Sequence, residues 1–199
     1  MIYDGEGKVI AYRIGDTIYR NDDFGDEFLP GTKGSDVLFG NEGRDVLFGD
    51  AGRDEIVGGS GNDFLVGGSG NDLYVFNGAD GQDTIVEDNT NSVDALSFKE
   101  GVLATDVIFS RSQDQPQDLL IQFTSGSNNQ IVVKGQFGEF GAIEQFFFSD
   151  GSSLTDQEVA HIVKLSETPP SFSDSTFDSS NYFNSHSSDN SNIWHCICL

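Results

Sequence analysis

Five aspartates recur at intervals of nine residues within the segment 31–75. Each of them is the last residue of a Gly-rich hexapeptide, and no insertion or deletion disturbs the spacing. The five are Asp36, Asp45, Asp54, Asp63 and Asp72. Carboxylate oxygens, combined with backbone carbonyls from tight turns, are the ligands that Ca²⁺ prefers, with about six to eight oxygens around each ion. The spacing therefore predicts a regular series of calcium sites.

Glycines at two fixed places of each nonapeptide support this chemistry. Gly tolerates positive φ, so a tight turn can direct its carbonyls inward without a Cβ clash. The first place is held by Gly31, Gly40, Gly49, Gly58 and Gly67, and the fourth by Gly34, Gly43, Gly52, Gly61 and Gly70. The second place holds Asn, Asp or Gly, which accept left-handed conformations, except for Thr32 in the first unit. We therefore expect the first unit to be the loosest.

A large apolar residue at the eighth place completes the unit. These residues are Leu38, Leu47, Ile56, Leu65 and Tyr74. Each nonapeptide is thus a six-residue turn followed by a three-residue strand, and a fixed period of this kind indicates a repeat architecture. A flexible Gly-rich linker is the alternative. It is disfavoured because a linker has no reason to keep Asp and an aliphatic residue in phase.

The five units resemble the calcium-binding nonapeptide of RTX (repeats-in-toxin) proteins, G-G-x-G-x-D-x-U-x, where U is large and apolar. The resemblance implies an all-β fold, a right-handed parallel β-roll with two nonapeptides per turn and an ion between stacked turns. It places Asp36, Asp54 and Asp72 on one edge and Asp45 and Asp63 on the other. Asp54 would then help to hold two ions, and the repeats would bind roughly three to five Ca²⁺ ions.

The phase of the repeat breaks after residue 75. The segment 76–86 retains Gly78, Gly81, Asp83 and Ile85, but Asp83 lies eleven residues beyond Asp72. Asp83 is a further candidate metal ligand that could close a last ion site with Asp63 or with Asp72.

The segment before the repeats, 1–30, is expected to be a capping element. Residues 2–3 and 9–12 flank a polar turn and predict a hairpin. The fragments 15–19 and 25–29 are similar to the end of a repeat unit but lack its spacing. A degenerate cap over the first turn of the roll and an unrelated hairpin remain equally open.

Ordinary strands are expected once the roll, 31–92, has ended. The alternation of apolar residues and turn clusters predicts strands at 93–98, 106–110, 118–123, 130–134 and 143–149. Three consecutive Phe, 146–148, suggest that the last strand is covered on both sides. Thr155 and Glu158 form a capping box at the start of a short helix, 156–165. The region also resembles the small antiparallel β cap that follows RTX repeats, ending here in Ile143-Glu144-Gln145 and a later Asp150-Gly151.

The last segment, 166–199, is rich in Ser, Asp and Asn and is expected to be a disordered tail. It is similar in kind to the C-terminal signal by which RTX proteins are exported through type I secretion machinery. Cys196 and Cys198 depart from that family, and they are the only cysteines, so no disulfide framework is expected.

The composition of the chain argues against several classes of function. The 199 residues carry a formal net charge of −23, from 33 acidic and 10 basic residues, which argues against nucleic-acid or anionic-membrane partners. No apolar run approaches a membrane span, and no cleavable signal is evident. Catalytic motifs are absent, and solvated roles are expected for His161, His186 and His195. We expect a non-enzymatic module of a secreted, extracellular bacterial protein that folds on Ca²⁺. An adhesin-type binding module, or a fragment of a secreted enzyme or toxin, is the alternative.

The seventh and ninth places of the repeats should point outward. Nine of these ten residues are apolar: Val37, Phe39, Val57, Leu73, Val75, Val46, Phe48, Phe64 and Val66, the exception being Glu55. Apolar surfaces of this kind usually mark an interface. We expect the strands after residue 93 to cover one face and the N-terminal hairpin to shield part of the other. At least one face should stay available to a second chain or an upstream domain.

Overall fold

The computed structural model describes residues 2–3, 9–14, 17–21, 25–78, 80–87, 92–99, 101–125, 128–138 and 143–167. Side chains are described from residue 25 onward. The expected disordered tail and secretion signal, with His186, His195 and both cysteines, lie outside these ranges, apart from residues 166 and 167.

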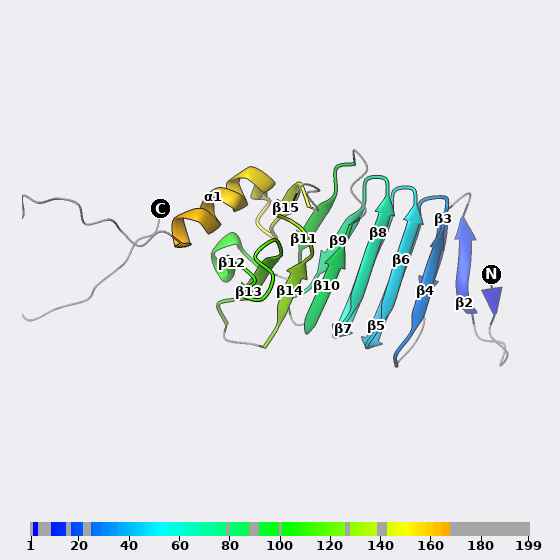
Figure 1. Ribbon diagram of the computed structural model, residues 1–199. Coiled ribbons are helices and arrows are strands. Elements are labelled where there is room, and N and C mark those ends of the chain that lie inside the picture. The colour runs from blue at the N-terminus through cyan, green and yellow to red at the C-terminus, as the bar shows by residue number, and fades with distance from the viewer. Residues whose placement is uncertain are drawn as a thin grey trace, which may run out of the picture. The chain divides into compact units, whose positions relative to one another are not determined.

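The chain coils into a parallel solenoid whose strands form two stacks (Figure 1). Consecutive repeat units alternate between the two stacks, so each turn adds one strand to each sheet. Sheet 1 has the order β1-β2-β3-β5-β7-β9-β11-β15-β16, and sheet 2 has the order β12-β13-β14-β10-β8-β6-β4. The predicted parallel roll, with about four turns, is confirmed.

The strands of sheet 1 are β1 (Ile2–Tyr3), β2 (Val9–Ile14), β3 (Thr17–Asn21), β5 (Asp36–Gly43), β7 (Glu55–Gly61), β9 (Leu73–Phe76), β11 (Ala95–Phe98), β15 (Gln145–Phe147) and β16 (Ser153–Thr155). The strands of sheet 2 are β4 (Phe28–Thr32), β6 (Val46–Ala51), β8 (Phe64–Ser69), β10 (Gln82–Val86), β12 (Val107–Arg111), β13 (Leu119–Phe123) and β14 (Gln130–Val133). A 3-10 helix, η1 (Ala104–Asp106), and an α-helix, α1 (Asp156–Glu167), complete the described elements.

A register of 18 residues governs the repeats. Val37 pairs with Glu55, and Glu55 pairs with Leu73. In the other sheet Val46 pairs with Phe64. Residues at the same place of alternate units therefore lie in rows across the strands, and any chemistry built into one unit is repeated along each edge of the roll.

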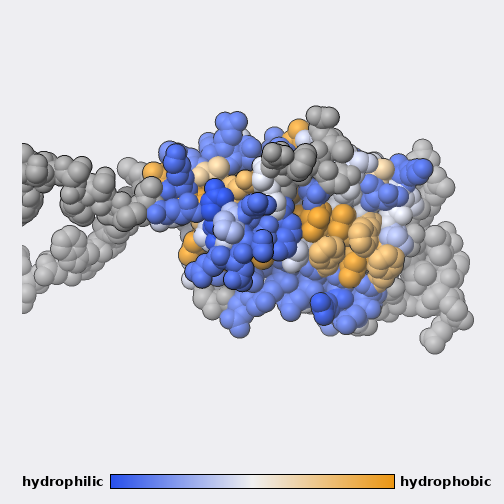
Figure 2. Space-filling view, viewed as in Figure 1, coloured by the Kyte–Doolittle hydropathy of each residue, from blue (hydrophilic) through white to orange (hydrophobic). Residues whose placement is uncertain are grey.

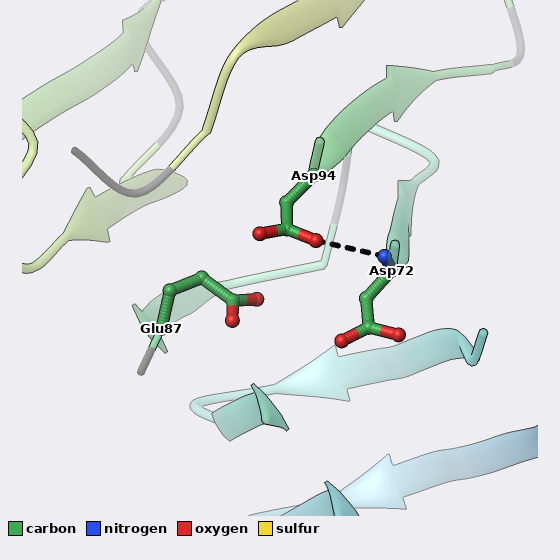
Figure 3. A group of neighbouring side chains, drawn as sticks. All are labelled: Asp72, Glu87 and Asp94. Atoms are coloured by element: carbon green, nitrogen blue, oxygen red, sulfur yellow. Dashed lines mark hydrogen bonds between the residues drawn. The ribbon is translucent and has the colours of Figure 1, made fainter. Parts of the chain in front are cut away.

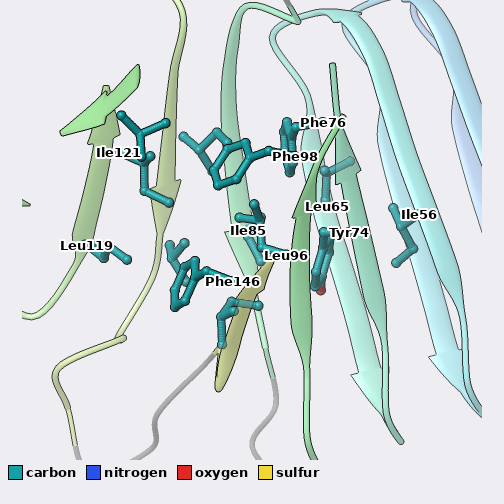
Figure 4. Packing of buried hydrophobic residues seen from close by; sticks show 14 of the residues in the cluster. Ile56, Leu65, Tyr74, Phe76, Ile85, Leu96, Phe98, Leu119, Ile121 and Phe146 are labelled. Atoms are coloured by element: carbon teal, nitrogen blue, oxygen red, sulfur yellow. The ribbon is translucent and has the colours of Figure 1, made fainter. Parts of the chain in front are cut away.

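The eighth-place residues form the inside of the roll. Leu38, Leu47, Ile56, Leu65 and Tyr74 are all fully buried. They join Ile85, Leu96 and Phe146 from the following strands in one continuous hydrophobic cluster (Figure 4). Side chains of this size contribute roughly 1.5–3 kcal/mol each when fully buried. This narrow core holds the two sheets together. The Gly-rich turns at the edges contribute no apolar side chain to it, so they can carry polar ligand groups.

The N-terminal hairpin is present, with β1 antiparallel to β2. β3 continues sheet 1 in parallel with β5, and β4 continues sheet 2 in parallel with β6. The prediction that fragment 25–29 lacks the repeat spacing is wrong. Leu29 pairs with Leu47, eighteen residues later, so Gly25, Glu27 and Leu29 occupy the fourth, sixth and eighth places of a further unit.

Parallel pairing also reaches beyond the expected end of the roll at residue 92. β10 pairs in parallel with β8 and β14, and β11 pairs in parallel with β9 and β15. The register grows from 18 to 20 and then 22 residues, because two residues are inserted before each of these strands. The expected antiparallel cap is therefore antiparallel only at β12–β13–β14 and at β15–β16.

Two details of the C-terminal region differ from expectation. Phe146 and Phe148 are buried, but Phe147 is 38% exposed, so strand β15 is covered on one side only. The helix follows the predicted capping box, since Thr155 N donates to Glu158 Oε2 at 2.8 Å. It extends two residues beyond the predicted end at residue 165. No helix within the described ranges has the length and apolar character needed to cross a membrane.

The outward face of sheet 2 is apolar (Figure 2). Phe28 is 64% exposed and Phe64 is 38% exposed, while Val46, Phe48 and Val66 are partly exposed. The expected cover from the strands after residue 93 is not found on this face of sheet 2, and the shielding expected from the N-terminal hairpin stays a prediction. Those strands hydrogen-bond to the ends of each sheet, so they lengthen the sheets and leave this face uncovered by any described residue.

Candidate metal centre

Two ladders of carboxylates run along the edges of the roll. In each ladder the Oδ1 atom of one sixth-place residue accepts a hydrogen bond from the backbone N–H of the sixth-place residue one turn earlier. On one edge Asp54 accepts from Asp36 at 2.7 Å, and Asp72 accepts from Asp54 at 2.8 Å. On the other edge Asp45 accepts from Glu27 at 2.8 Å, and Asp63 accepts from Asp45 at 2.9 Å. The structure therefore brings together the predicted aspartates in the two predicted rows.

Both ladders continue past the five regular units. Asp83 accepts from Asp63 N–H at 2.9 Å, so it continues the ladder of Asp63 and not that of Asp72, while a last ion site at Asp83 stays a prediction. On the other edge Asp94 accepts from Asp72 N–H at 2.8 Å, and Glu144 accepts from Asp94 N–H at 2.7 Å. The expected site residues thus form part of a longer system that begins at Glu27 and ends at Glu144.

The second carboxylate oxygen distinguishes these groups from ordinary structural aspartates. The Oδ2 atoms of Asp45, Asp54 and Asp63 are buried and have no hydrogen-bond partner among the described residues. A buried anionic oxygen without a partner is costly, because desolvation is not compensated. The donor set of these edges, hard carboxylate oxygens beside turn carbonyls, is that of a Ca²⁺ site. The residues fit a bound Ca²⁺ ion, which would supply the missing partner.

Asp36, in the first unit, differs from the next three. Its Oδ2 atom accepts hydrogen bonds from Thr32 N at 2.6 Å and Thr32 Oγ1 at 3.0 Å. The second-place residues of the next units, Asn41 and Asp50, adopt positive φ of 72° and 76°, whereas Thr32 does not. Asp36 thus has at Oδ2 the partner that the next three aspartates lack, and the expectation that the first unit is the loosest stays a prediction.

The first-place glycines leave room at this oxygen. A Cβ atom built on Gly40 would collide with Asp45 Oδ2 and with the carbonyl of Gly58. A Cβ on Gly49 would collide with Asp54 Oδ2 and with the carbonyl of Gly67. A carboxylate oxygen and a carbonyl from the next turn thus converge beside each of these glycines.

The fourth-place glycines have a different task. Cβ atoms built on Gly52, Gly61 and Gly70 would overlap the carbonyl region of the fourth-place glycine one turn earlier. These residues therefore allow the turns to stack closely. The structure does not place them as cation ligands, and their role in the predicted site stays a proposal.

Burial in a row of like charges shifts the acidity of the ladder. Burial raises the pKa of Asp54 to about 7, with added repulsion from Asp72 and Asp36. Burial likewise raises the pKa of Asp63 to about 6 and that of Asp83 to about 8, against the lowering effect of the N–H bonds they accept. Without a bound cation, these three carboxylates therefore hold a proton at higher pH in the folded roll than free aspartates do.

A pH dependence of the metal-free protein follows. Because the pKa values of Asp54, Asp63 and Asp83 are higher in the folded state than in the unfolded chain, folding takes up protons. Stability from these groups is fully present below about pH 4 and is lost as the pH rises through the range of about 6 to 8. In excess chelator, circular dichroism should show more β-structure at pH 5 than at pH 8. More structure at pH 8 would contradict this account of the ladder.

A further carboxylate cluster closes one edge of the roll (Figure 3). One ligand-type oxygen from each of Asp72, Glu87 and Asp94 lies within 4.8 Å of the others. Glu87 belongs to the second two-residue insertion, and its Oε1 atom accepts a hydrogen bond from the hydroxyl of the buried Tyr74. The uninterrupted nine-residue period does not predict Glu87 and Asp94, because it ends with residue 75.

If two inserted residues are allowed before a unit, the repeat pattern also predicts Asp83 and Asp94. The segment 78–86 reads GADGQDTIV and is a full repeat unit, and 89–97 keeps Asp94 in sixth place and Leu96 in eighth. Glu27 is found by extending the period backward without any insertion. Glu144 carries no such signal, since fifty residues separate it from Asp94 in the sequence.

Two family models match parts of this chain. Three overlapping segments, 23–56, 40–74 and 48–85, match the family model of the RTX calcium-binding nonapeptide repeat (4 copies). Residues 118–158 match the haemolysin-type calcium binding protein related domain. One similar solved structure is the solution structure of the AlgE6R3 subunit from the Azotobacter vinelandii mannuronan C5-epimerase. It is 27% identical, with 58% of this chain and 73% of that chain covered and a TM-score of 0.42. No curated protein gives a significant match.

Proposed function

We propose that this chain, which contains RTX haemolysin-type calcium-binding nonapeptide repeats, is a non-catalytic module that folds when it meets Ca²⁺ outside the cell. It would stabilise or present an extracellular bacterial protein exported through type I secretion machinery. The observation that carries the proposal is the set of buried Oδ2 atoms of Asp45, Asp54 and Asp63, which have no partner among the described residues.

The physics of the ladder supports a switch between compartments. RTX repeats bind calcium, and extracellular calcium modules bind with Kd of roughly 10⁻⁴–10⁻³ M. At the far lower Ca²⁺ concentration of a cytosol, the ladder carboxylates repel one another and the chain stays extended. Since the site exists only in the folded state, the binding free energy becomes folding free energy. The same carboxylates thus keep the chain unfolded before export, where Ca²⁺ is scarce, and allow it to fold afterwards, where Ca²⁺ is abundant.

Substitution of single ladder residues tests the proposal. Asp54 lies between Asp36 and Asp72 and would serve ions on both of its sides. Asp36 has one such neighbour, and its Oδ2 atom is already hydrogen-bonded to Thr32. Asp54→Ala should therefore weaken the apparent Ca²⁺ affinity by about tenfold or more, and Asp36→Ala by clearly less.

Isothermal titration calorimetry with Ca²⁺ measures both variants, with Asp26→Ala as the control. Asp26 is exposed and lies beside the ladder, at the fifth place of its unit. Equal effects of Asp54→Ala and Asp36→Ala, or an equally large effect of Asp26→Ala, would argue against ions between stacked turns.

A binding module is the second candidate function, and one observation favours it. The outer face of sheet 2 exposes Phe28 and Phe64 in a continuous apolar area (Figure 2). Large exposed apolar patches rarely persist on monomeric soluble proteins without an interface. The roll would then present this face to a second chain or to another domain, in addition to folding on Ca²⁺.

A further inference from the structure

A groove crosses the outer face of sheet 1, on the side of the strands away from the core. It has a volume of about 590 Å³. Its floor is β11, and its walls are β9 on one side and β15 on the other. The residues that matter for its chemistry are Arg53, Leu73, Ala95, Ser97, Lys99 and Phe147.

The groove results from side-chain size. Ala95 pairs with Leu73 and with Gln145, while Ser97 pairs with Val75 and with Phe147. The outward positions of the middle strand are thus small, and those of both neighbours are large. Strands lie about 4.8 Å apart, so the backbones of β9 and β15 are about 10 Å apart. Ser97 at the floor of the groove is only 5% exposed, so an extended polypeptide would lie along the rim, against Leu73 and Phe147.

A positively charged side chain lies at each end of this groove. Arg53 comes two residues before β7, in the same place of its unit as Asn71 and Val93 of the next two turns, so it marks the end where the strands begin. Lys99 directly follows β11 and marks the other end. The chain has only 10 basic residues against 33 acidic ones. Neither Arg53 nor Lys99 forms an ion pair with any residue that the structure describes.

Nearby acidic groups do not cancel these charges. Asp72 lines the groove but is buried, and its Oδ1 atom accepts the N–H of Asp54. Glu55 is exposed on the neighbouring strand β7 but does not line the groove. At physiological ionic strength the remaining negative charge of the molecule is screened over about 8 Å. Among the charged side chains that line the groove, Arg53 and Lys99 are therefore exposed and the one carboxylate, Asp72, is buried.

We propose that this groove binds an extended acidic peptide segment, with an apolar side chain in the middle and a carboxylate near each end. The apolar walls from Leu73 and Phe147 suit a hydrophobic side chain, and Arg53 and Lys99 suit the two carboxylates. An acidic oligosaccharide fits less well. Its many hydroxyls need polar partners, and the uncharged side chains that line the groove as donors are few: Asn71, Ser97 and Gln145.

The length of the groove defines the probe. Six steps separate Val93 from Lys99, and at about 3.3 Å per residue they span about 20 Å. A fluorescent heptapeptide with aspartate at both ends, leucine in the centre and serine between them has the matching extended length. The same peptide with asparagine in place of aspartate is the neutral control.

Fluorescence anisotropy with Ca²⁺-saturated protein tests the assignment. Each of Arg53→Gln and Lys99→Gln should weaken binding of the acidic peptide about two- to fivefold, as expected for an exposed ion pair. Ser97→Leu, which fills the groove, should abolish binding. Arg44→Gln is the matched control, because Arg44 holds the fifth place of the preceding unit, outside this groove, and it should leave binding unchanged.

Three results would overturn the proposal. They are equal binding of the neutral peptide, unchanged binding by Arg53→Gln and Lys99→Gln, and binding of an acidic oligouronate in place of the peptide with the same sensitivity to these variants. Circular dichroism of every variant in Ca²⁺ establishes that the roll is folded. A folded, calcium-responsive protein that ignores the peptide refutes the groove assignment alone and leaves the calcium-dependent function intact.

Discussion

Chelation of Ca²⁺ is expected to unfold the repeat region and remove most of its β-sheet signal in far-ultraviolet circular dichroism. Without ions, the buried carboxylates of each ladder face one another without a compensating charge. The narrow core of eighth-place residues must then stabilise the stacked turns alone. Adding Ca²⁺ back should restore the signal cooperatively at roughly 10⁻⁴–10⁻³ M.

Magnesium provides the control for this experiment. Mg²⁺ requires a small octahedral site with oxygens at about 2.0–2.1 Å and gives up its water reluctantly, so a pliable cage between two turns suits it poorly. The same concentration of Mg²⁺ should restore little structure. A β-rich spectrum in excess chelator at neutral pH would falsify the proposed dependence on calcium.

Gly61→Ala should prevent stacking even when Ca²⁺ is saturating. Gly61 has a φ of +146°, and a Cβ atom there would overlap the backbone carbonyl of Gly43 one turn earlier. A backbone carbonyl cannot move aside without separating the turns. The overlap and the cost of positive φ for a residue with a Cβ atom add. We therefore expect Gly61→Ala to lower the free energy of unfolding by more than about 3 kcal/mol, measured by urea denaturation in Ca²⁺.

Gly151→Ala separates the two causes of this effect. Gly151 also has a positive φ, +87°, but a Cβ atom built on it meets nothing within 4 Å. Gly151→Ala should lower the free energy of unfolding only by the cost of positive φ, about 1–2 kcal/mol. If Gly61→Ala costs no more than Gly151→Ala, the close contact between stacked turns is not a major source of stability.

Strict periodicity explains how much of the fold follows from sequence. Gly, Asp and an apolar residue at fixed places define one turn and one strand, and a period of two units fixes the register of 18 residues. The two rows of aspartates follow directly from this register. The inward Leu38 and Ile56 and the outward Val37 follow from strand alternation.

The remainder depends on contacts that no local pattern records. Two-residue insertions shift the phase, so Asp94 looks unrelated to Asp72 although its carboxylate receives the Asp72 N–H. Glu144 is brought to Asp94 by the path of the whole C-terminal region. The exposure of Phe147 likewise could not be predicted, because three consecutive Phe fit a strand buried on one face or on both.

The most direct test of the account is the location of the ions themselves. Crystals grown in Ca²⁺ should show anomalous scattering peaks between stacked turns, beside the Oδ2 atoms of Asp45, Asp54 and Asp63. Each peak should have about six to eight oxygen neighbours at about 2.3–2.6 Å. Anomalous peaks confined to exposed carboxylates, with these three oxygens left without an ion, would contradict the account.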